Sequence, residues 1–164
     1  ALDIFLGGNF YQSDLDSLRR VLGGQEHFAP LILMPYLAGP EFSVDCVADR
    51  GRIVCAVPRH KLQGTGEGQI IDPREDVLAA CTELGQQFSL NGFVNIQFRD
   101  SKEGLRVLEI NPRMSGGIAM ACLGGPNLPY LGIAGFDRGF EYMDIPEIHA
   151  NLRVGEMNTA LVLT

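Results

Sequence analysis

Two short segments of alternating polar and apolar residues, separated by a turn, constrain the fold of this chain most strongly. They are residues 92–99, with the sequence GFVNIQFR, and residues 106–113, with the sequence RVLEINPR. Successive side chains of a strand point to opposite faces of a sheet, so each segment has one apolar and one polar face. The residues between them include DSKEG, which is typical of a turn. The sequence therefore predicts a β-hairpin with one apolar face.

The alternation also predicts how the two strands pair. With the turn centred on Glu103, Gln97 lies opposite Glu109 and Asn95 lies opposite Asn111. The two polar faces then coincide, whereas a slip by one residue would set polar side chains against apolar ones. Carboxylate and amide oxygens are ligands that Mg²⁺ accepts together with phosphate oxygens. An ordinary hairpin with one solvated face would show the same alternation, so the pattern by itself leaves both interpretations open.

The rest of the chain reads as further strands with a few helices between them. Residues 42–47 and 52–57 flank the turn sequence ADRG and predict a second hairpin. Apolar runs predict short strands at 31–34 and 159–163, and apolar periodicity predicts helices near 13–24 and 72–91. Further helices are expected near 117–123, which is rich in small residues, and near 128–134. This order predicts an α+β fold with a mainly antiparallel sheet packed by helices, rather than the alternating βαβ order of a dinucleotide-binding fold.

The charge balance excludes some classes of partner. The chain has 164 residues and a net charge of −7, from 13 basic and 20 acidic side chains. This balance argues against a general binder of nucleic acid or of anionic membranes. No apolar stretch approaches the roughly 20 residues that a membrane helix needs. We therefore expect no nucleic-acid partner and no membrane association.

The four cysteines are predicted to be structural. Cys46, Cys55, Cys81 and Cys122 match no C-x-x-C metal or redox pattern, and each has apolar neighbours. Free cysteines of this kind are usually small buried side chains in a reducing compartment. We therefore expect a cytoplasmic location and assign the thiols no chemistry.

Two groups of basic residues lie beside glycines, and each has two interpretations. Arg113 precedes the sequence MSGG, and its planar guanidinium suits either a phosphoryl oxygen or a surface ion pair. Arg59 and Lys61 open a glycine-rich loop that lacks the terminal G-K-[ST] of a Walker A motif. They are candidates for binding phosphates or a substrate carboxylate, or else belong to the start of a solvated loop.

The segments NIQF and LEINPR, followed by SGG, resemble the C-terminal lobe of ATP-grasp proteins, in particular the carbamoyl phosphate synthase-like branch. Residues 33–45, LMPYLAGPEFSVD, are similar to the adenine hinge of that family and the strand after it. The resemblance covers residues 31–131 and implies that the fold is this lobe. It also implies that Glu109 and Asn111 ligate Mg²⁺, with Gln97 at a third ligand position where many relatives have a carboxylate. Arg113 would be the catalytic residue that contacts the transferring phosphoryl group.

The resemblance further implies how the nucleotide is held. Backbone atoms of the hinge would line adenine, except at its proline, which lacks an N–H group. The nucleotide-binding residues implied are Met34, Tyr36 and Leu37 at adenine, Glu41 at the ribose hydroxyls, and one of Arg59 and Lys61 near the phosphates or the substrate.

The activity implied is that of an ATP-dependent ligase. ATP with Mg²⁺ would phosphorylate a small-molecule carboxylate, and an amine or a thiol would then displace phosphate from the acyl phosphate. One alternative is a non-catalytic nucleotide-binding or assembly module that retains the fold, which Gln97 favours. A weaker alternative is a two-carboxylate hydrolase in which Asp45 and Glu109 flank a cleft. The oligomeric state, including a homo-oligomer, is left open.

The length indicates an incomplete active site. Complete ATP-grasp enzymes place a further domain and a small lobe with nucleotide-binding lysines before this region. This chain begins with alanine, and its residues 4–10, IFLGGNF, resemble the end of a phosphate loop without its lysine. We expect residues 1–30 to be a remnant of the small lobe and residues 31–164 to be the C-terminal lobe, so that the chain is about half an enzyme.

Overall fold

The computed structural model describes residues 13–62 and 68–157, and the chain divides into two compact units at the Tyr36–Leu37 bond. The expected phosphate-loop remnant at 4–10, the strand at 159–163 and residues 63–67 of the glycine-rich loop lie outside the described residues. None of the helices in the described part is long and apolar enough to cross a membrane.

The first unit contains one described helix, α2 (Leu15–Gly23). The Asp14 carboxylate caps it by accepting hydrogen bonds from the Ser17 N–H at 2.8 Å and the Ser17 hydroxyl at 2.7 Å. The prediction of a strand at 31–34 is wrong, because these described residues form neither a helix nor a strand. Prolines stand on both sides of the run, and a proline has no N–H group to donate to a neighbouring strand.

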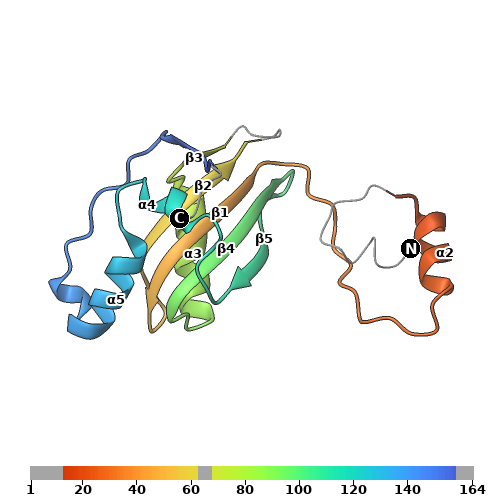
Figure 1. The fold of residues 1–164 in the computed structure, drawn as a ribbon, viewed down its shortest axis with the longest axis horizontal. Coiled ribbons are helices and arrows are strands. Elements are labelled where there is room, and N and C mark those ends of the chain that lie inside the picture. The colour runs from red at the N-terminus through yellow and green to blue at the C-terminus, as the bar shows by residue number, and fades with distance from the viewer. Residues whose placement is uncertain (1–12, 63–67, 158–164) are drawn as a thin grey trace, which may run out of the picture. The chain divides into compact units, whose positions relative to one another are not determined.

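The second unit is built on a mixed α+β arrangement around a six-stranded antiparallel sheet, as the sequence predicts. The described strands lie in the order β5-β4-β1-β2-β3-β6 (Figure 1). Their bounds are β1 Glu41–Asp49, β2 Arg52–Lys61, β3 Gln69–Ile71, β4 Gly92–Ser101, β5 Gly104–Asn111 and β6 Arg153–Val154. The helices of this unit are α3 Glu75–Gln87, α4 Ile118–Cys122, α5 Leu128–Arg138 and the 3₁₀ helix η1 Phe140–Tyr142.

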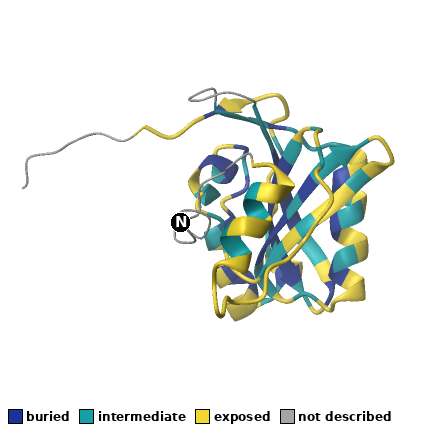
Figure 2. Cartoon of the chain, turned by 90° about the vertical axis from the view of Figure 1, so that its right-hand side faces the viewer, coloured by how far each residue is buried: buried dark blue, intermediate teal, exposed yellow. Residues whose placement is uncertain are grey.

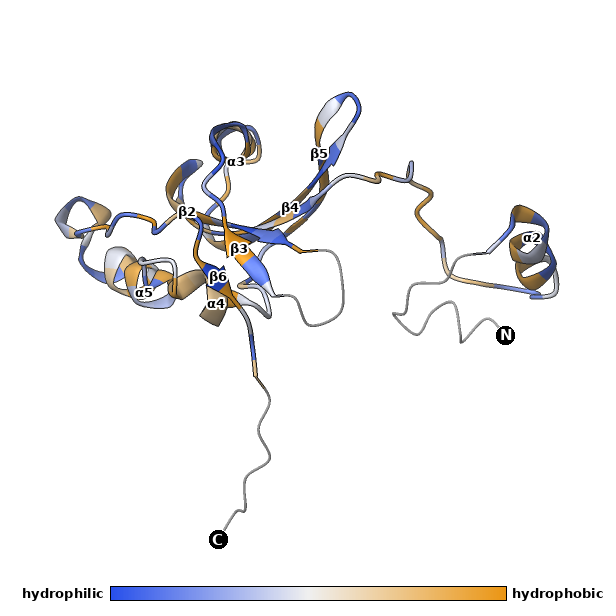
Figure 3. Cartoon of the chain, turned by 90° about the horizontal axis from the view of Figure 1, so that it is seen from above, coloured by the Kyte–Doolittle hydropathy of each residue, from blue (hydrophilic) through white to orange (hydrophobic). Residues whose placement is uncertain are grey.

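Helices cover both faces of the sheet, with α3 on one side and α4 and α5 on the other (Figure 3). Phe42 and Val44 of β1 pack with Val77 of α3 in one apolar core. In the other core, Val47 of β1 packs with Leu128 of α5. The central strand β1 is therefore buried over most of its length, and the longest buried stretches run along the middle of the sheet (Figure 2).

The backbone conformation of the β1–β2 turn explains why the sequence ADRG is typical of a hairpin. Arg50 and Gly51 both have positive φ angles, 48° and 88°, which is the conformation of a two-residue type I′ turn. Glycine adopts this conformation without the steric cost of a Cβ atom. The predicted hairpin of 42–47 and 52–57 is confirmed, and both strands extend beyond the predicted bounds.

The β4–β5 hairpin confirms the predicted register where the candidate site lies. Asn95 pairs with Asn111, and Gln97 pairs with Glu109. Beyond Gln97 the pairing shifts by one residue, so that Phe98 pairs with Val107 rather than with Leu108. A β-bulge therefore lies between the candidate site and the turn. Because of this shift, the turn is shorter than the predicted turn, which is centred on Glu103.

Candidate functional site

The sheet face that packs against α4 and α5 becomes polar toward one end. The alternation along β1 places Ser43 and Asp45 on the same face as the buried Val47. Antiparallel pairing extends this polar area across neighbouring strands, because directly paired residues share a face. Its members are Glu41, Ser43, Asp45, Arg59, Lys61, Gln69, Asn95, Gln97, Arg99, Glu109 and Asn111. The polar side of the predicted hairpin is thus one edge of a larger polar face.

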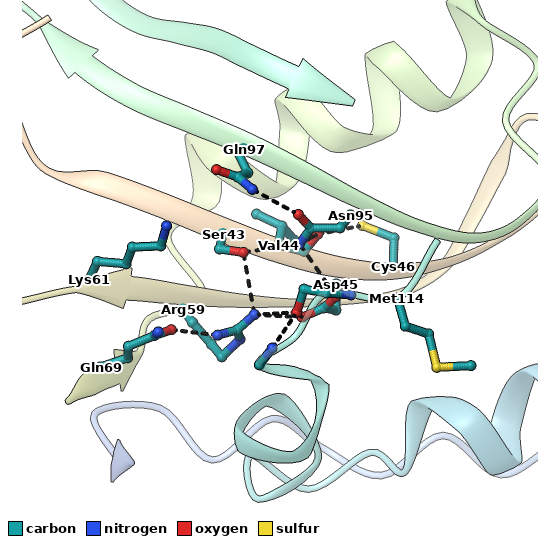
Figure 4. Close-up of polar contacts among 12 residues, drawn as sticks. Ser43, Val44, Asp45, Cys46, Arg59, Lys61, Gln69, Asn95, Gln97 and Met114 are labelled. Carbon is teal, nitrogen blue, oxygen red and sulfur yellow. Dashed lines mark hydrogen bonds and ion pairs between the residues drawn. The ribbon is translucent and has the colours of Figure 1, made fainter. Parts of the chain in front are cut away.

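The predicted magnesium ligands lie at the β5 edge of this face. Asn111 donates from Nδ2 to Glu109 Oε1 at 2.9 Å. Gln97, directly opposite Glu109, donates from Nε2 to Asn95 Oδ1 at 3.3 Å (Figure 4). Glu109 is exposed and Asn111 is half-buried. The structure therefore brings the three predicted ligands together on neighbouring strands, with their carboxylate open to solvent.

Arg113 lies just past the end of β5, close in sequence to the predicted metal ligands. Its N–H donates to the Asn111 carbonyl at 2.8 Å, and its Nη1 donates to the Met114 carbonyl at 3.0 Å. The side chain is exposed. Its guanidinium is therefore available to a ligand at this edge.

Arg59 is a buried residue of strand β2, whereas the sequence predicts it at the start of a glycine-rich loop. It is only 1% exposed, and its Nη2 donates to Asp45 Oδ2 at 2.7 Å and to Ser115 Oγ at 2.8 Å. The same nitrogen lies 3.3 Å from Ser43 Oγ, and Nη1 donates to Gln69 Oε1 at 2.5 Å (Figure 4). Among the described residues, Nε has no hydrogen-bond partner. The two predicted basic residues of β2 thus have different surroundings, because Lys61 is partly exposed.

Lys61 lies beside Glu41, which is the residue predicted to reach the ribose. The Lys61 ammonium and Arg99 Nη2 each donate to one oxygen of the Glu41 carboxylate, the latter at 2.8 Å. Arg99 also donates from Nη1 to the Leu37 carbonyl at 3.0 Å. Arg99 therefore connects the predicted adenine-hinge residue Leu37 to the polar face. Met34 and Tyr36, the other two hinge residues, belong to the first unit.

A second charged cluster holds the start of β1 in place. Arg74 donates to both oxygens of Asp100, at 2.7 and 2.8 Å, and its guanidinium lies 4.5 Å from the centre of the Phe42 ring. These hydrogen bonds lower the pKa of Asp100 below its ordinary value. The Asp100 backbone accepts from the Gly39 N–H at 3.2 Å and donates to the Pro40 carbonyl at 2.9 Å. The cluster thus fixes the segment that leads into β1.

A buried polar network surrounds Asp45, and its role was not predicted from the sequence. Asp45 entered only as one carboxylate of a hydrolase, and Ser43, Arg99 and Ser115 were not predicted as site residues. A signal for two of them was present, because β1 reads FSVDCV and so sets Ser43 and Asp45 at alternate positions within an apolar strand. Which neighbours would satisfy them depends on the pairing of distant strands.

The second unit therefore combines an antiparallel sheet with an edge of carboxylate and amide side chains. Sequence comparison identifies the family of the chain. Residues 27–160 match the family described as "ATP-grasp in the biosynthetic pathway with Ter operon", and the chain belongs to this family.

Individual relatives match only part of the chain. The large chain of carbamoyl phosphate synthase from Agathobacter rectalis is 29% identical over 103 residues, which are 56% of this chain and 10% of that protein. The same protein from Clostridium perfringens is 31% identical over 98 residues, covering 52% of this chain and 9% of the relative. The matches thus span about a tenth of the length of these curated relatives.

Two of the solved structures that are similar to this chain align with more than half of its residues. An L-amino acid ligase from Bacillus licheniformis has a TM-score of 0.44 at 21% identity, covering 61% of this chain and 30% of that chain. The macrocyclase MdnB from Microcystis aeruginosa MRC has a TM-score of 0.45 at 17% identity, covering 77% and 46% respectively.

Proposed function

We propose that this chain is the phosphate- and metal-binding part of an ATP-dependent ligase. The observation that carries the proposal is the β4–β5 register, which sets Gln97 opposite Glu109 and leaves Asn111 in contact with Glu109. Arg113 follows two residues later with an exposed guanidinium. Membership of the ATP-grasp family supports the same assignment. In this proposal residues 1–30 and 31–164 belong to the small and C-terminal lobes, respectively.

The donor set fits Mg²⁺ if a nucleotide supplies further ligands. No group of three or more His, Cys, Asp or Glu side chains within 13–62 and 68–157 is arranged to hold a metal. Mg²⁺, however, commonly takes one or two carboxylates, keeps several waters and completes its shell with substrate phosphates. Glu109 would provide the carboxylate, with amide oxygens from Asn111 and Gln97. When bound, the ion would neutralise charge on the phosphates during transfer.

The residues of the chain would hold ATP and a small carboxylate for phosphoryl transfer. A carboxylate oxygen would bond to the γ-phosphorus while the bond from that phosphorus to the β–γ bridging oxygen breaks, giving ADP and an acyl phosphate. An amine or a thiol would then bond to the carbonyl carbon and lose its proton, and inorganic phosphate would leave. Arg113 would donate hydrogen bonds to the phosphoryl oxygens as they pass between the two partners.

Some of the nucleotide contacts proposed from the resemblance have more support in the structure than others. Glu41 accepts one hydrogen bond on each oxygen, and each carboxylate oxygen has a second lone pair for a ribose hydroxyl. Of the two candidate cations, Lys61 is better placed to meet a phosphate because it is partly exposed, whereas Arg59 is buried. Met34, Tyr36 and Leu37 would contact adenine through backbone atoms.

The test is a substitution of Glu109 in the intact protein that contains this chain. We expect Glu109→Gln to lower Mg²⁺-dependent ADP release by at least about tenfold, since loss of even an outer partner of a metal ligand costs roughly 10–100-fold. Glu83→Gln is the matched control, because Glu83 is exposed on α3, which packs on the other face of the sheet. ADP release would be followed with a panel of small carboxylates and amines.

Each result separates the proposed ligase from a non-catalytic module. Unchanged ADP release in Glu109→Gln would contradict the proposed role of this edge. Calorimetric binding of Mg-ATP by the intact protein without any turnover would favour the non-catalytic nucleotide-binding module instead. Loss of turnover in Glu109→Gln but not in Glu83→Gln would support the ligase.

A further inference from the structure

The segment that carries Arg113 is attached to the central strand through Ser115. The Ser115 N–H donates to Asp45 Oδ1 at 2.9 Å, and the Ser115 hydroxyl donates to Asp45 Oδ2 at 2.7 Å. The same hydroxyl accepts from Arg59 Nη2 at 2.8 Å and from the Gly117 N–H at 3.1 Å. One carboxylate of β1 thus holds both the backbone and the side chain of this residue, which lies between β5 and α4.

The Asp45 carboxylate is itself fixed in direction. Residue Asp45 is only 1% exposed, and its carboxylate forms an ion pair with Arg59 and accepts from Asn95 Nδ2 at 3.3 Å. Strands β1, β2 and β4 therefore all contribute to the point at which Ser115 is held. The backbone of Gly117 closes over the Arg59 guanidinium so closely that a Cβ atom there would lie 2.9 Å from Arg59 Cζ. Such contacts leave the attachment point little freedom to move.

Arg113 lies midway between two anchored residues. Asn111, two residues before it, pairs with Asn95 at the end of β5, and Ser115 follows two residues after it. Two residues reach at most about 7 Å when fully extended, so the backbone position of Arg113 depends on both anchors. The hydrogen bonds of Ser115 therefore help to determine where the Arg113 guanidinium can bind a ligand.

We propose that Asp45 and Ser115 are positioning residues, which set the Arg113 guanidinium beside the edge formed by Glu109 and Asn111. The inference rests on the proposed function, because Arg113 needs this placement only if it binds a phosphoryl group. Asp45 and Ser115 act through hydrogen bonds to the segment and do not themselves touch the ligand. A purely structural role predicts a different kinetic result, which the following experiment detects.

Ser115→Ala in the intact protein tests the proposal. Asp45→Asn is a poorer first choice, because it removes the counter-charge of a buried guanidinium and is expected to destabilise the whole unit. In Ser115→Ala we expect kcat for Mg-ATP turnover to fall about tenfold or more while KM changes little, since small misplacements of a catalytic group can cost about 100-fold. Ser115→Thr retains a hydroxyl and is expected to recover most of kcat.

Ser43→Ala is the matched control for a general effect on the buried network. Ser43 Oγ accepts from Arg59 Nη2 at 3.3 Å and from Asn95 Nδ2 at 3.0 Å, and its strand is central in the sheet. It therefore shares two partners of Asp45 without holding the segment of Arg113. We expect Ser43→Ala to lower kcat much less than Ser115→Ala does. An equal loss of kcat in Ser43→Ala and Ser115→Ala would overturn the positioning role.

A double-mutant cycle with Arg113→Ala identifies the residue through which Ser115 acts. If Ser115 positions Arg113, Ser115→Ala has little further effect on kcat once Arg113 is alanine. Additive losses, or an unchanged kcat in Ser115→Ala, would overturn this inference and leave the proposed function intact. If Arg113→Ala itself leaves turnover unchanged, or the intact protein has no Mg-ATP turnover, the proposed function fails and the inference fails with it.

Discussion

Asp45 on β1 and Arg59 on β2 form an ion pair inside the protein, with Oδ2 and Nη2 2.7 Å apart and each side chain only 2% exposed. Charged groups removed from water in this way depend on each other, because either one alone would lack both hydration and a counter-charge. Ser43, Asn95 and Ser115 supply further hydrogen bonds to the pair. The polar face thus contains a buried ion pair in addition to the solvent-exposed edge at Glu109.

Removing one charge of this pair is expected to destabilise the protein strongly. We predict that Asp45→Asn lowers the free energy of unfolding by about 3–5 kcal/mol, since it leaves the Arg59 guanidinium buried without a counter-charge. Arg59→Met in the Asp45→Asn background is expected to recover part of this loss, because it removes the uncompensated charge. Urea unfolding of the single and double variants measures both effects. Strictly additive losses would show that the two side chains do not stabilise each other.

The glycine at position 117 is predicted to be required by its contact with the ion pair. A Cβ atom there would collide with the guanidinium of Arg59, whereas nothing lies within 4 Å of a Cβ atom at Gly116. We predict that Gly117→Ala lowers the free energy of unfolding by about 1–3 kcal/mol, as overpacking of a filled site usually does. Gly116→Ala is the control, with an expected change within about 0.5 kcal/mol. Equal effects of the two alanines in thermal unfolding would contradict this explanation.

The sequence predicts the exposed edge of the site better than its buried part. Glu109 and Asn111 could be placed opposite Gln97 and Asn95 because strand alternation is a local pattern, and a slip of register would have mixed the faces. The pairing of Asp45 with Arg59 depends on which strands neighbour β1, which local periodicity does not encode. The bulge beyond Gln97 was missed for a similar reason, since it arises where the turn and the strand pairing have to be reconciled.

The strand predicted at 31–34 shows another limit of local patterns. Its apolar residues satisfy the composition expected of a strand, yet a strand also needs a partner for its N–H and C=O groups. Helices α2 and α3 were predicted near their observed positions, because their apolar residues recur with helical spacing. Periodicity therefore located helices well, whereas strands also required knowledge of their neighbours.

The cysteines are predicted to react slowly in the folded protein. All four thiols are free, and Cys46, Cys55 and Cys81 are buried while Cys122 is half-buried. Burial raises the pKa of Cys55 to about 11, and contact with the Cys81 thiol together with burial raises the pKa of Cys46. Since the thiolate is the nucleophile, we expect iodoacetamide at about pH 8 to modify Cys122 first, with Cys55 slower by about 100-fold than an ordinary thiol.

Peptide mass spectrometry over a time course measures this order of modification. Denaturation in urea is the control, because it exposes all four thiols and is expected to make their rates similar. If Cys46 or Cys55 reacts as fast as Cys122 in the native protein, the sheet opens more readily than its buried core indicates.

The bidentate pair of Arg74 and Asp100 is predicted to make stability depend on pH in acid. Hydrogen bonds from Arg74 lower the pKa of Asp100 in the folded protein, so the unfolded chain takes up the proton first as the pH falls. The stabilisation is therefore fully present above the ordinary carboxyl pKa of about 4 and is lost as the pH falls below it. We predict that Asp100→Asn lowers the free energy of unfolding by about 1–3 kcal/mol at neutral pH, as loss of charged hydrogen bonds does.

The difference between Asp100→Asn and the unchanged protein should narrow as the pH falls from about 5 to 2, because protonated Asp100 no longer offers a charge to Arg74. Asp144→Asn is the control, since Asp144 is exposed beyond η1, and its substitution is expected to change stability by less than about 0.5 kcal/mol. Urea unfolding at a series of pH values measures both differences. A gap between Asp100→Asn and the unchanged protein that stays constant with pH would show that the charge of Asp100 does not hold the entry to β1.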